Sequence, residues 1–236
     1  MENDEIIGSI ESIYDRFGII GNLRQHMKTV AAVGDYIMDS RKAGKGGFGS
    51  TDVAAALLLH DLGNIVKFDF GNRDLWKGYG SEEIENWRKA REIVAVKYGS
   101  ENDHELTSMM VRELGAGARI SFLVSNMVYE NIGNVLDSDD FELKVCTYAD
   151  QRVAPSGVVS VKQRFSDLRL RYAGRKGWNT SMLDDNGAIE LQGQVFAGTH
   201  IHPEDVKMEV LLPYIRSYGA PVPARRPGRV SKRLSQ

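Results

Sequence analysis

Apolar residues recur every three or four positions along the first three quarters of the chain. This is the period of amphipathic helices that bury one face. The pattern predicts helices, in chain order, over residues 4–17, 22–40, 52–62, 82–98, 104–114, 118–131, 140–153, 162–172 and 203–218. A chain with so many helical segments and one candidate hairpin is predicted to be all-α.

Several predicted helix ends carry residues that favour helix capping. Asn22 stands where the second helix begins, and Asn102 with Glu105 three positions later has the form of a capping box. Gly99 and Gly115 follow the last apolar positions of two further helices, where glycine commonly ends a helix. These ends support the division of the chain into separate helices.

The pattern changes beyond residue 175, where the chain becomes polar and rich in Gly and Asn. Asp185-Asn186-Gly187 has the composition of a hairpin turn, and Pro203 is suited to open a last helix. Residues 221–236 are rich in Pro and Arg and are predicted to be disordered. We therefore expect a helical domain at 1–175, with its core at 22–175, and a C-terminal extension at 176–236 of mixed or irregular structure.

Charge and composition argue against several classes of partner and location. Thirty basic residues against 32 acidic ones give a net charge of -2, which argues against nucleic acid as a partner. Cys146 is the one cysteine, so an intrachain disulfide is excluded and a reducing compartment is favoured. The apolar run 53–59 is far shorter than the roughly 20 residues that span a bilayer. We expect a cytoplasmic protein without a membrane partner. The sequence leaves open whether the chain forms a homo-oligomer.

The pair His60-Asp61 is the strongest chemical signal. It follows Val53 to Leu59, which are all apolar, so its helix is predicted to be buried on nearly every side. A carboxylate there is costly unless a positive group pairs with it, and the negative end of the helix dipole favours a cation. A divalent metal satisfies both conditions, with imidazole and carboxylate as ligands.

Two more polar side chains point inward from apolar helix faces. His26 lies between Leu23 and Val30, and Asp150 shares a face with Cys146 and Val153. Each also has an ordinary interpretation, as a hydrogen-bonded core histidine and as the salt-bridge partner of a nearby arginine. Inward-pointing ligands from several helices are nevertheless how metal sites in helical bundles are built.

The order His26, His60-Asp61, Asp150 resembles that of the HD-domain metal-dependent phosphohydrolases. The local segments ALLLHDLGN and CTYADQRV are similar to the two motifs that carry the ligands in that family, and the resemblance covers about residues 22–175. It implies a helical bundle that holds a divalent ion (Mn, Co, Ni, Fe, Zn or Mg) and hydrolyses a phosphate ester. The expected substrate is a nucleotide or another small phosphorylated metabolite, as a monoester or a diester.

The resemblance also implies roles for individual residues. His26, His60, Asp61 and Asp150 are the expected metal ligands, and Asp61 is also expected to orient the attacking water. His104 is expected to stabilise the leaving group, with Glu105 orienting its ring. The candidate cations for the substrate phosphate are Lys67, Arg152, Arg164 and Arg24.

Two departures from the family pattern keep alternatives open. Asn64 stands where many relatives have Lys or Glu, and His104 is the one histidine between the HD pair and Asp150. Asn64 favours a non-catalytic module that binds metal or nucleotide, and the presence of only one histidine in this interval argues against a di-iron oxygenase.

The loop at 42–49 resembles a phosphate-binding loop without its usual ending, so we expect a linker or lid. The pair His200 and His202 lies outside the matched region.

Overall fold

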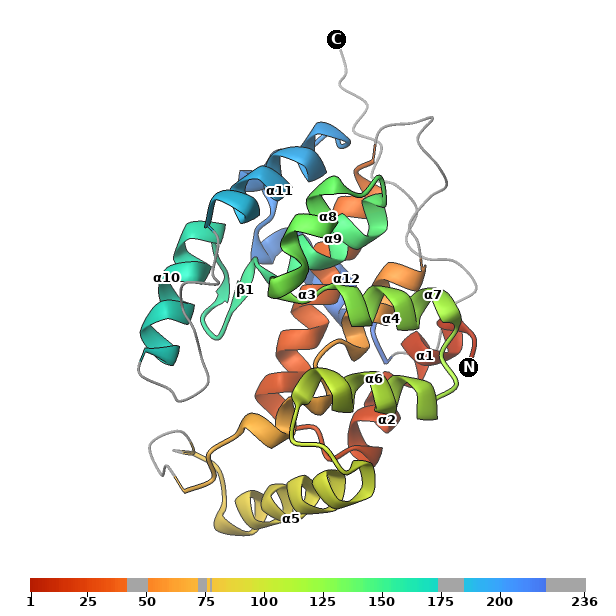
Figure 1. Ribbon diagram of the computed structural model, residues 1–236, viewed down its shortest axis with the longest axis vertical. Helices are drawn as coiled ribbons and strands as arrows, with labels where there is room; N and C mark the ends of the chain where they lie inside the picture. Colours follow the sequence, from red (N-terminus) through yellow and green to blue (C-terminus); the bar gives the residue numbers. More distant parts are fainter. Residues whose placement is uncertain (42–50, 72–75, 77, 174–184, 220–236) are drawn as a thin grey trace.

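The structure, a computed structural model, describes residues 1–41, 51–71, 76, 78–173 and 185–219. These residues are mainly helical, which confirms the predicted all-α fold (Figure 1). In chain order the α-helices are α1 (Asn3–Gly8), α2 (Ile10–Arg16), α3 (Gly21–Asp39), α4 (Thr51–Leu59), α5 (Ser81–Tyr98), α6 (Asp103–Glu113), α7 (Ala118–Asn126), α8 (Ile132–Asp137), α9 (Phe141–Asp150), α10 (Val161–Tyr172), α11 (Asp185–Ala197) and α12 (Met208–Ser217).

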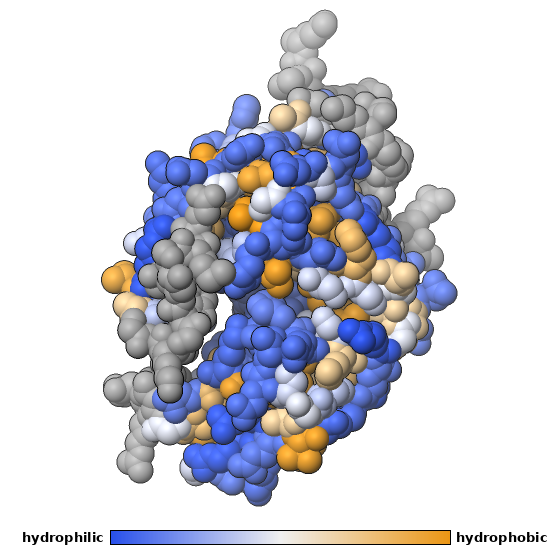
Figure 2. Space-filling view, viewed as in Figure 1, coloured by the Kyte–Doolittle hydropathy of each residue, from blue (hydrophilic) through white to orange (hydrophobic). Residues whose placement is uncertain are grey.

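Shorter elements connect some of these helices. The 3-10 helices are η1 (Leu62–Lys67), η3 (Tyr129–Asn131) and η5 (Pro203–Asp205). A small antiparallel hairpin of β1 (Val153–Ala154) and β2 (Gly157–Val158) follows α9. Among the described residues, none of the helices has both the length and the apolar character needed to cross a bilayer. Figure 2 shows a mainly polar face on which apolar side chains form small, separate patches.

Helix α4 forms the centre of the core. Its residues 53–59 are all fully buried, as the unbroken apolar run predicts. Helices α3, α7 and α9 pack against it. The contact with α3 is close at Gly34, where an added Cβ would lie 2.3 Å from Leu57 Cδ1. Because α3, α4 and α9 are in mutual contact, polar residues at their ends come together.

The C-terminal elements pack onto the same core. Helix α11 contacts α8 and α9, and α12 contacts α3. The hairpin predicted around Asp185 is wrong, because Asp185 begins α11. Ala188, Leu191 and Val195 form a buried apolar stripe on this helix, and burial of the stripe outweighs the turn preference of Asp-Asn-Gly. Within 185–219 the predicted mixed or irregular extension is mostly helical.

Other predicted boundaries need correction. Residues 4–17 form two helices that meet at Ser9, and the helix predicted at 118–131 ends earlier and is followed by η3 and by α8, which was not predicted. Asn22 is not a cap, because α3 begins at Gly21. The helix predicted at 52–62 ends at Leu59 and is followed by η1. The loop predicted at 42–49 and the disordered tail predicted at 221–236 lie outside the described residues.

Candidate metal centre

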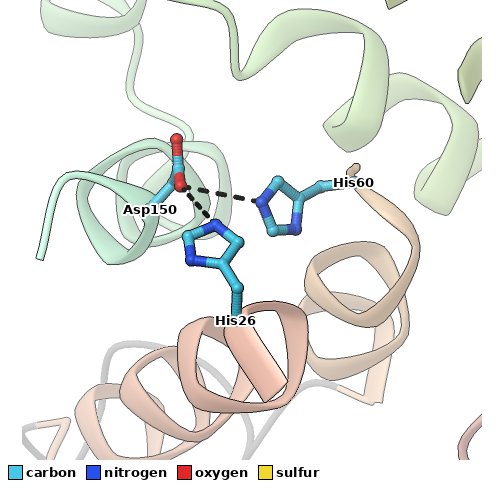
Figure 3. A group of neighbouring side chains, drawn as sticks. All are labelled: His26, His60 and Asp150. Atoms are coloured by element: carbon cyan, nitrogen blue, oxygen red, sulfur yellow. Dashed lines mark ion pairs between the residues drawn. The ribbon is translucent and has the colours of Figure 1, made fainter. Parts of the chain in front are cut away.

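Three side chains from three different elements converge on one point (Figure 3). His26, His60 and Asp150 each offer a ligand atom, and these atoms all lie within 4.8 Å of one another. His26 Nε2 is 3.2 Å from Asp150 Oδ1, and His60 Nε2 is 3.6 Å from the same oxygen. The predicted convergence of these residues is therefore present in the structure.

The packing of the core brings these residues together. His26 lies next to Met27, a buried residue of α3, and Asp150 is the last residue of α9. His60 follows directly after the end of α4, and not within its last turn as the sequence suggested. Because α4 contacts both α3 and α9, its C-terminal end delivers His60 to the space between them.

His60 is oriented by the backbone of α4, the helix that precedes it. Its Nδ1 lies 2.7 Å from the carbonyl oxygen of Leu57, to which the Nδ1–H group donates. Its Nε2 is buried and forms no hydrogen bond to the described residues. A buried nitrogen without a hydrogen bond is costly, and coordination of a metal would satisfy it. The hydrogen bond at Nδ1 is the kind of outer contact that fixes a metal-binding imidazole.

Asp61, the fourth predicted ligand, lies beside this group but is not part of it. Its Oδ2 lies 3.6 Å from Nε2 of His26 and 3.6 Å from Nε2 of His60. It therefore borders the group of three from the side of the two imidazoles. Two imidazoles and two carboxylates form a donor set that suits a divalent transition metal.

Charges within the cluster shift two pKa values. Burial alone would lower the pKa of His60, but the carboxylates of Asp61 and Asp150 raise it to about 9. Burial alone would raise the pKa of Asp150, but the imidazoles of His26 and His60 bring it well below its ordinary value. The metal-free cluster therefore holds a proton on His60 and a negative charge on Asp150 at neutral pH.

A small cavity of about 40 Å³ opens onto the cluster. Asp61 and His104 line it together with His60 and Asp150. The rest of its lining consists of Val124, Met127, Val128 and Tyr129. A water molecule needs roughly 10–15 Å³ of such space, so the cavity accommodates an ion with a few bound waters.

Near this cavity, His104 belongs to a second charged group. Asp103 is buried and forms an ion pair with Lys67, and its Oδ2 lies 3.7 Å from His104 Nε2. The side chain of His104 is 53% exposed. Glu105, predicted to orient this ring, instead accepts a hydrogen bond from Ser100 Oγ at 2.7 Å. Asp103 is thus the carboxylate beside His104, and the interpretation of Glu105 needs correction.

The four candidate cations have different surroundings. Arg164 is buried, and its Nη2 lies 3.8 Å from Asp150 Oδ1. Lys67 reaches the site only through Asp103. Nη1 of Arg24 lies 2.7 Å from Oδ1 of Asp15. The guanidinium of Arg152 donates to the carbonyl oxygens of Val159 and Pro203, away from the cluster. Of the four, Arg164 is the cation that contacts a predicted metal ligand.

Sequence reasoning missed two residues at this site. Asp103 resembles an ordinary acidic residue in the first turn of a helix, so nothing local distinguishes it. Tyr129 lies in η3 with its hydroxyl buried. Burial raises the pKa of Tyr129, and the nearby Asp150 raises it further. Neither residue belongs to the apolar and ligand patterns that identified the cluster.

The other sequence candidates lie elsewhere. The backbone N–H of His200 donates to the carbonyl oxygen of Ser40, and that of His202 donates to Asp205. Neither histidine belongs to the metal-ligand group found among the described residues. Comparison of the chain with protein-family models, with curated proteins and with solved structures finds no match.

Proposed function

We propose that this protein is an HD-type metal-dependent phosphohydrolase that acts on a nucleotide or another small phosphorylated metabolite. The observation that carries the proposal is the convergence of His26, His60 and Asp150 within 4.8 Å. Asp61 adds a second carboxylate, whose Oδ2 lies 3.6 Å from Nε2 of His26 and 3.6 Å from Nε2 of His60. These residues occur along the chain in the order on which the resemblance to the HD-domain phosphohydrolases rests.

In this proposal the ligands are Nε2 of the two histidines and the carboxylates of Asp61 and Asp150. The ion supplies Lewis acidity and lowers the pKa of a bound water toward neutrality. Two imidazole ligands favour Mn, Fe, Co, Ni or Zn over Mg. Asp61 borders the cavity, so we assign it the orientation of the attacking water. A cytoplasmic location remains part of the proposal.

Charged side chains around the cavity would act on the substrate. Arg164 lies 3.8 Å from Asp150 and is positioned to balance phosphate charge. His104 lines the cavity, and we assign it the protonation of the leaving group. Asp103, 3.7 Å from His104 Nε2, would act as a positioning residue through its carboxylate. This assignment replaces the role first given to Glu105.

A second candidate function is a non-catalytic HD-fold module that binds metal or nucleotide and has a regulatory role. Asn64, in place of an acidic or basic residue, favours it, and so does the cavity volume of about 40 Å³. A cavity of that size holds an ion and water but not a nucleotide, which occupies several hundred Å³. Catalysis therefore requires the site to open.

One experiment separates the candidates. The purified chain is analysed for metal and assayed with phosphate monoesters and diesters in the presence of Mn²⁺, Co²⁺, Ni²⁺ or Mg²⁺. The proposal expects hydrolysis that Asp61→Ala abolishes and that Asp139→Ala, an exposed control, leaves unchanged. Tight metal binding without turnover supports the regulatory module. Oxygen consumption with two bound irons supports an oxygenase and contradicts both.

A further inference from the structure

A second cavity, of about 350 Å³, shares no lining residue with the cavity of the metal centre. It is lined by residues of α10, of α11 and of η5 together with Arg152 and Ser160. Its polar lining includes Lys162, Gln192 and Glu204, and its apolar lining includes Val161 and Ile189. The volume falls within the range of about 300–1,000 Å³ that is usual for small-molecule sites.

Arg152 is the unusual residue of this cavity. It is 5% exposed, and its guanidinium donates to the carbonyl oxygens of Val159, Pro203 and Val206 and to the hydroxyl of Tyr148. All four acceptors are uncharged, and no carboxylate of the described residues lies within 4.0 Å of the guanidinium. The other buried arginine, Arg164, has two carboxylates within that distance.

A buried charge is costly unless an opposite charge balances it. The guanidinium has five N–H donors, and its four hydrogen bonds leave one donor over. Because Arg152 lines the cavity, an anion bound there would balance its charge and accept this donor. The backbone carbonyls fix the guanidinium in place, so little side-chain entropy would be lost on binding.

Other residues of the cavity strengthen its preference for an anion. Lys162 lies in the first turn of α10, where the helix dipole also favours negative charge. The carboxamide oxygen of Gln192 accepts a hydrogen bond from Tyr148 Oη at 3.1 Å, which leaves its NH₂ group to donate to a ligand. Glu204 also lines the cavity but is exposed. Its single negative charge opposes an anion but does not cancel the two positive charges of Arg152 and Lys162.

We infer that this cavity binds a small organic anion, with its carboxylate, phosphate or phosphonate group on Arg152 and Lys162 and its apolar part against Val161 and Ile189. Ile189 is a large apolar side chain that is 39% exposed, and a bound apolar group would cover it. The inference does not depend on the proposed hydrolase activity.

The test uses the full-length, metal-free chain and phenylphosphonate as the probe. The carbon–phosphorus bond of this probe is not a phosphate ester, so ester hydrolysis cannot consume it. Isothermal titration measures its affinity, and methylphosphonate, which lacks the ring, is the matched probe. We expect saturable binding of phenylphosphonate that is tighter than that of methylphosphonate, because only the ring reaches Ile189.

Variants identify the site of binding. Arg152 holds three backbone carbonyls, so its replacement risks unfolding, and Lys162→Gln is the safer change. We expect it to weaken binding about fivefold, as loss of one exposed charge contact allows. Glu204→Gln is expected to tighten binding by removing an opposing charge. Lys89→Gln, on the distant helix α5 (Figure 1), is the control and is expected to have no effect.

Two outcomes overturn the inference. The first is the absence of saturable phenylphosphonate binding by the wild-type chain at millimolar concentration. The second is binding that His60→Gln weakens and Lys162→Gln leaves unchanged, which would place the probe at the metal centre. Metal-dependent hydrolysis is measured in a separate assay, so failure of the anion site and failure of the proposed function are distinguishable.

Discussion

The Nδ1 atom of His60 lies 2.7 Å from the carbonyl oxygen of Leu57, one turn earlier in the chain. This hydrogen bond commits Nδ1 to the backbone and leaves Nε2 as the atom that faces Asp150, 3.6 Å away. The imidazole is therefore oriented before any metal binds. Despite burial, the carboxylates of Asp61 and Asp150 raise its pKa to about 9, so in the metal-free protein we expect a proton at the position that a metal would take.

The first prediction concerns the pH dependence of the metal-free protein. The pKa of His60 is raised from 6.5 to about 9 by folding, so its contribution to stability is complete below about 6.5 and is lost as the pH rises through 9. The melting temperature measured without metal should therefore fall across this interval. His60→Gln should remove this part of the pH dependence, and an unchanged profile would contradict the assigned pKa.

The same raised pKa of His60 extends the first prediction to metal binding, which should release this proton. A ligand imidazole must be neutral at the coordinating nitrogen, so binding near neutral pH displaces the proton from His60 Nε2. Titration calorimetry in buffers of low and high ionisation enthalpy measures the release. We expect the number of protons released to fall as the pH passes 9, whereas a number that does not change with pH would argue against His60 as a ligand.

A second prediction concerns Asp150. Asp150→Asn keeps the shape of the side chain but removes the charge that faces both imidazoles. Residues that only orient metal ligands contribute roughly 10- to 100-fold to affinity, so loss of a ligand should weaken metal binding at least that much. Competition with a chromogenic chelator measures the affinity. The exposed Asp139→Asn is the control, and equal affinities for both variants would exclude Asp150 as a ligand.

A third prediction distinguishes the roles of Asp103 and Glu105. Asp103 lies beside His104 and pairs with Lys67, whereas Glu105 is bound to Ser100. If the chain hydrolyses phosphate esters, Asp103→Asn should lower kcat about tenfold, a part of the 10²–10⁴-fold that a general acid contributes. KM should change less, and the basic limb of the pH–rate profile should shift.

Glu105→Gln is the matched control for this prediction, since it changes the neighbouring acidic position in the same helix. It should leave kcat and the pH–rate profile close to those of the wild type, because its carboxylate does not contact His104. The opposite result, with Glu105→Gln as the slower variant, would restore the first interpretation of the sequence.

A fourth prediction concerns the packing of η1 on α6. A Cβ added at Gly63 would lie 2.2 Å from the carbonyl oxygen of Asp103 and 2.7 Å from the backbone nitrogen of Thr107. Gly63→Ala must therefore move the backbone of α6, and we expect it to reduce the free energy of unfolding by about 1–3 kcal/mol. Denaturant unfolding with its midpoint and slope measures the change.

Gly133→Ala serves as the control for Gly63→Ala. Gly133 lies in α8 with nothing within 4 Å of an added Cβ. Alanine is the better helix former by up to about 1 kcal/mol, so this variant should be neutral or slightly more stable. Equal destabilisation of both variants would show that the contact at Gly63 is not as close as described.

The sequence by itself determined the helical class and the residues of the cluster. Seven successive apolar residues at 53–59 require a helix buried on all sides, so the His60-Asp61 pair at its end had to face the interior or its edge. The apolar stripes of α3 and α9 likewise placed His26 and Asp150 inward. These conclusions need only local periodicity and the cost of burying a charge, which are properties of the chain.

Only the tertiary structure decided which charged groups meet. Arg152 and Arg164 looked equivalent as phosphate ligands, but α9 ends at Asp150 and the hairpin that follows turns Arg152 toward the carbonyls of Val159 and Pro203. Asp103 and Glu105 both adjoin His104 in the chain, and only the packing places the carboxylate of Asp103 beside the ring. Such choices depend on packing between segments remote in sequence, and a difference of one or two residues reverses the direction of a side chain.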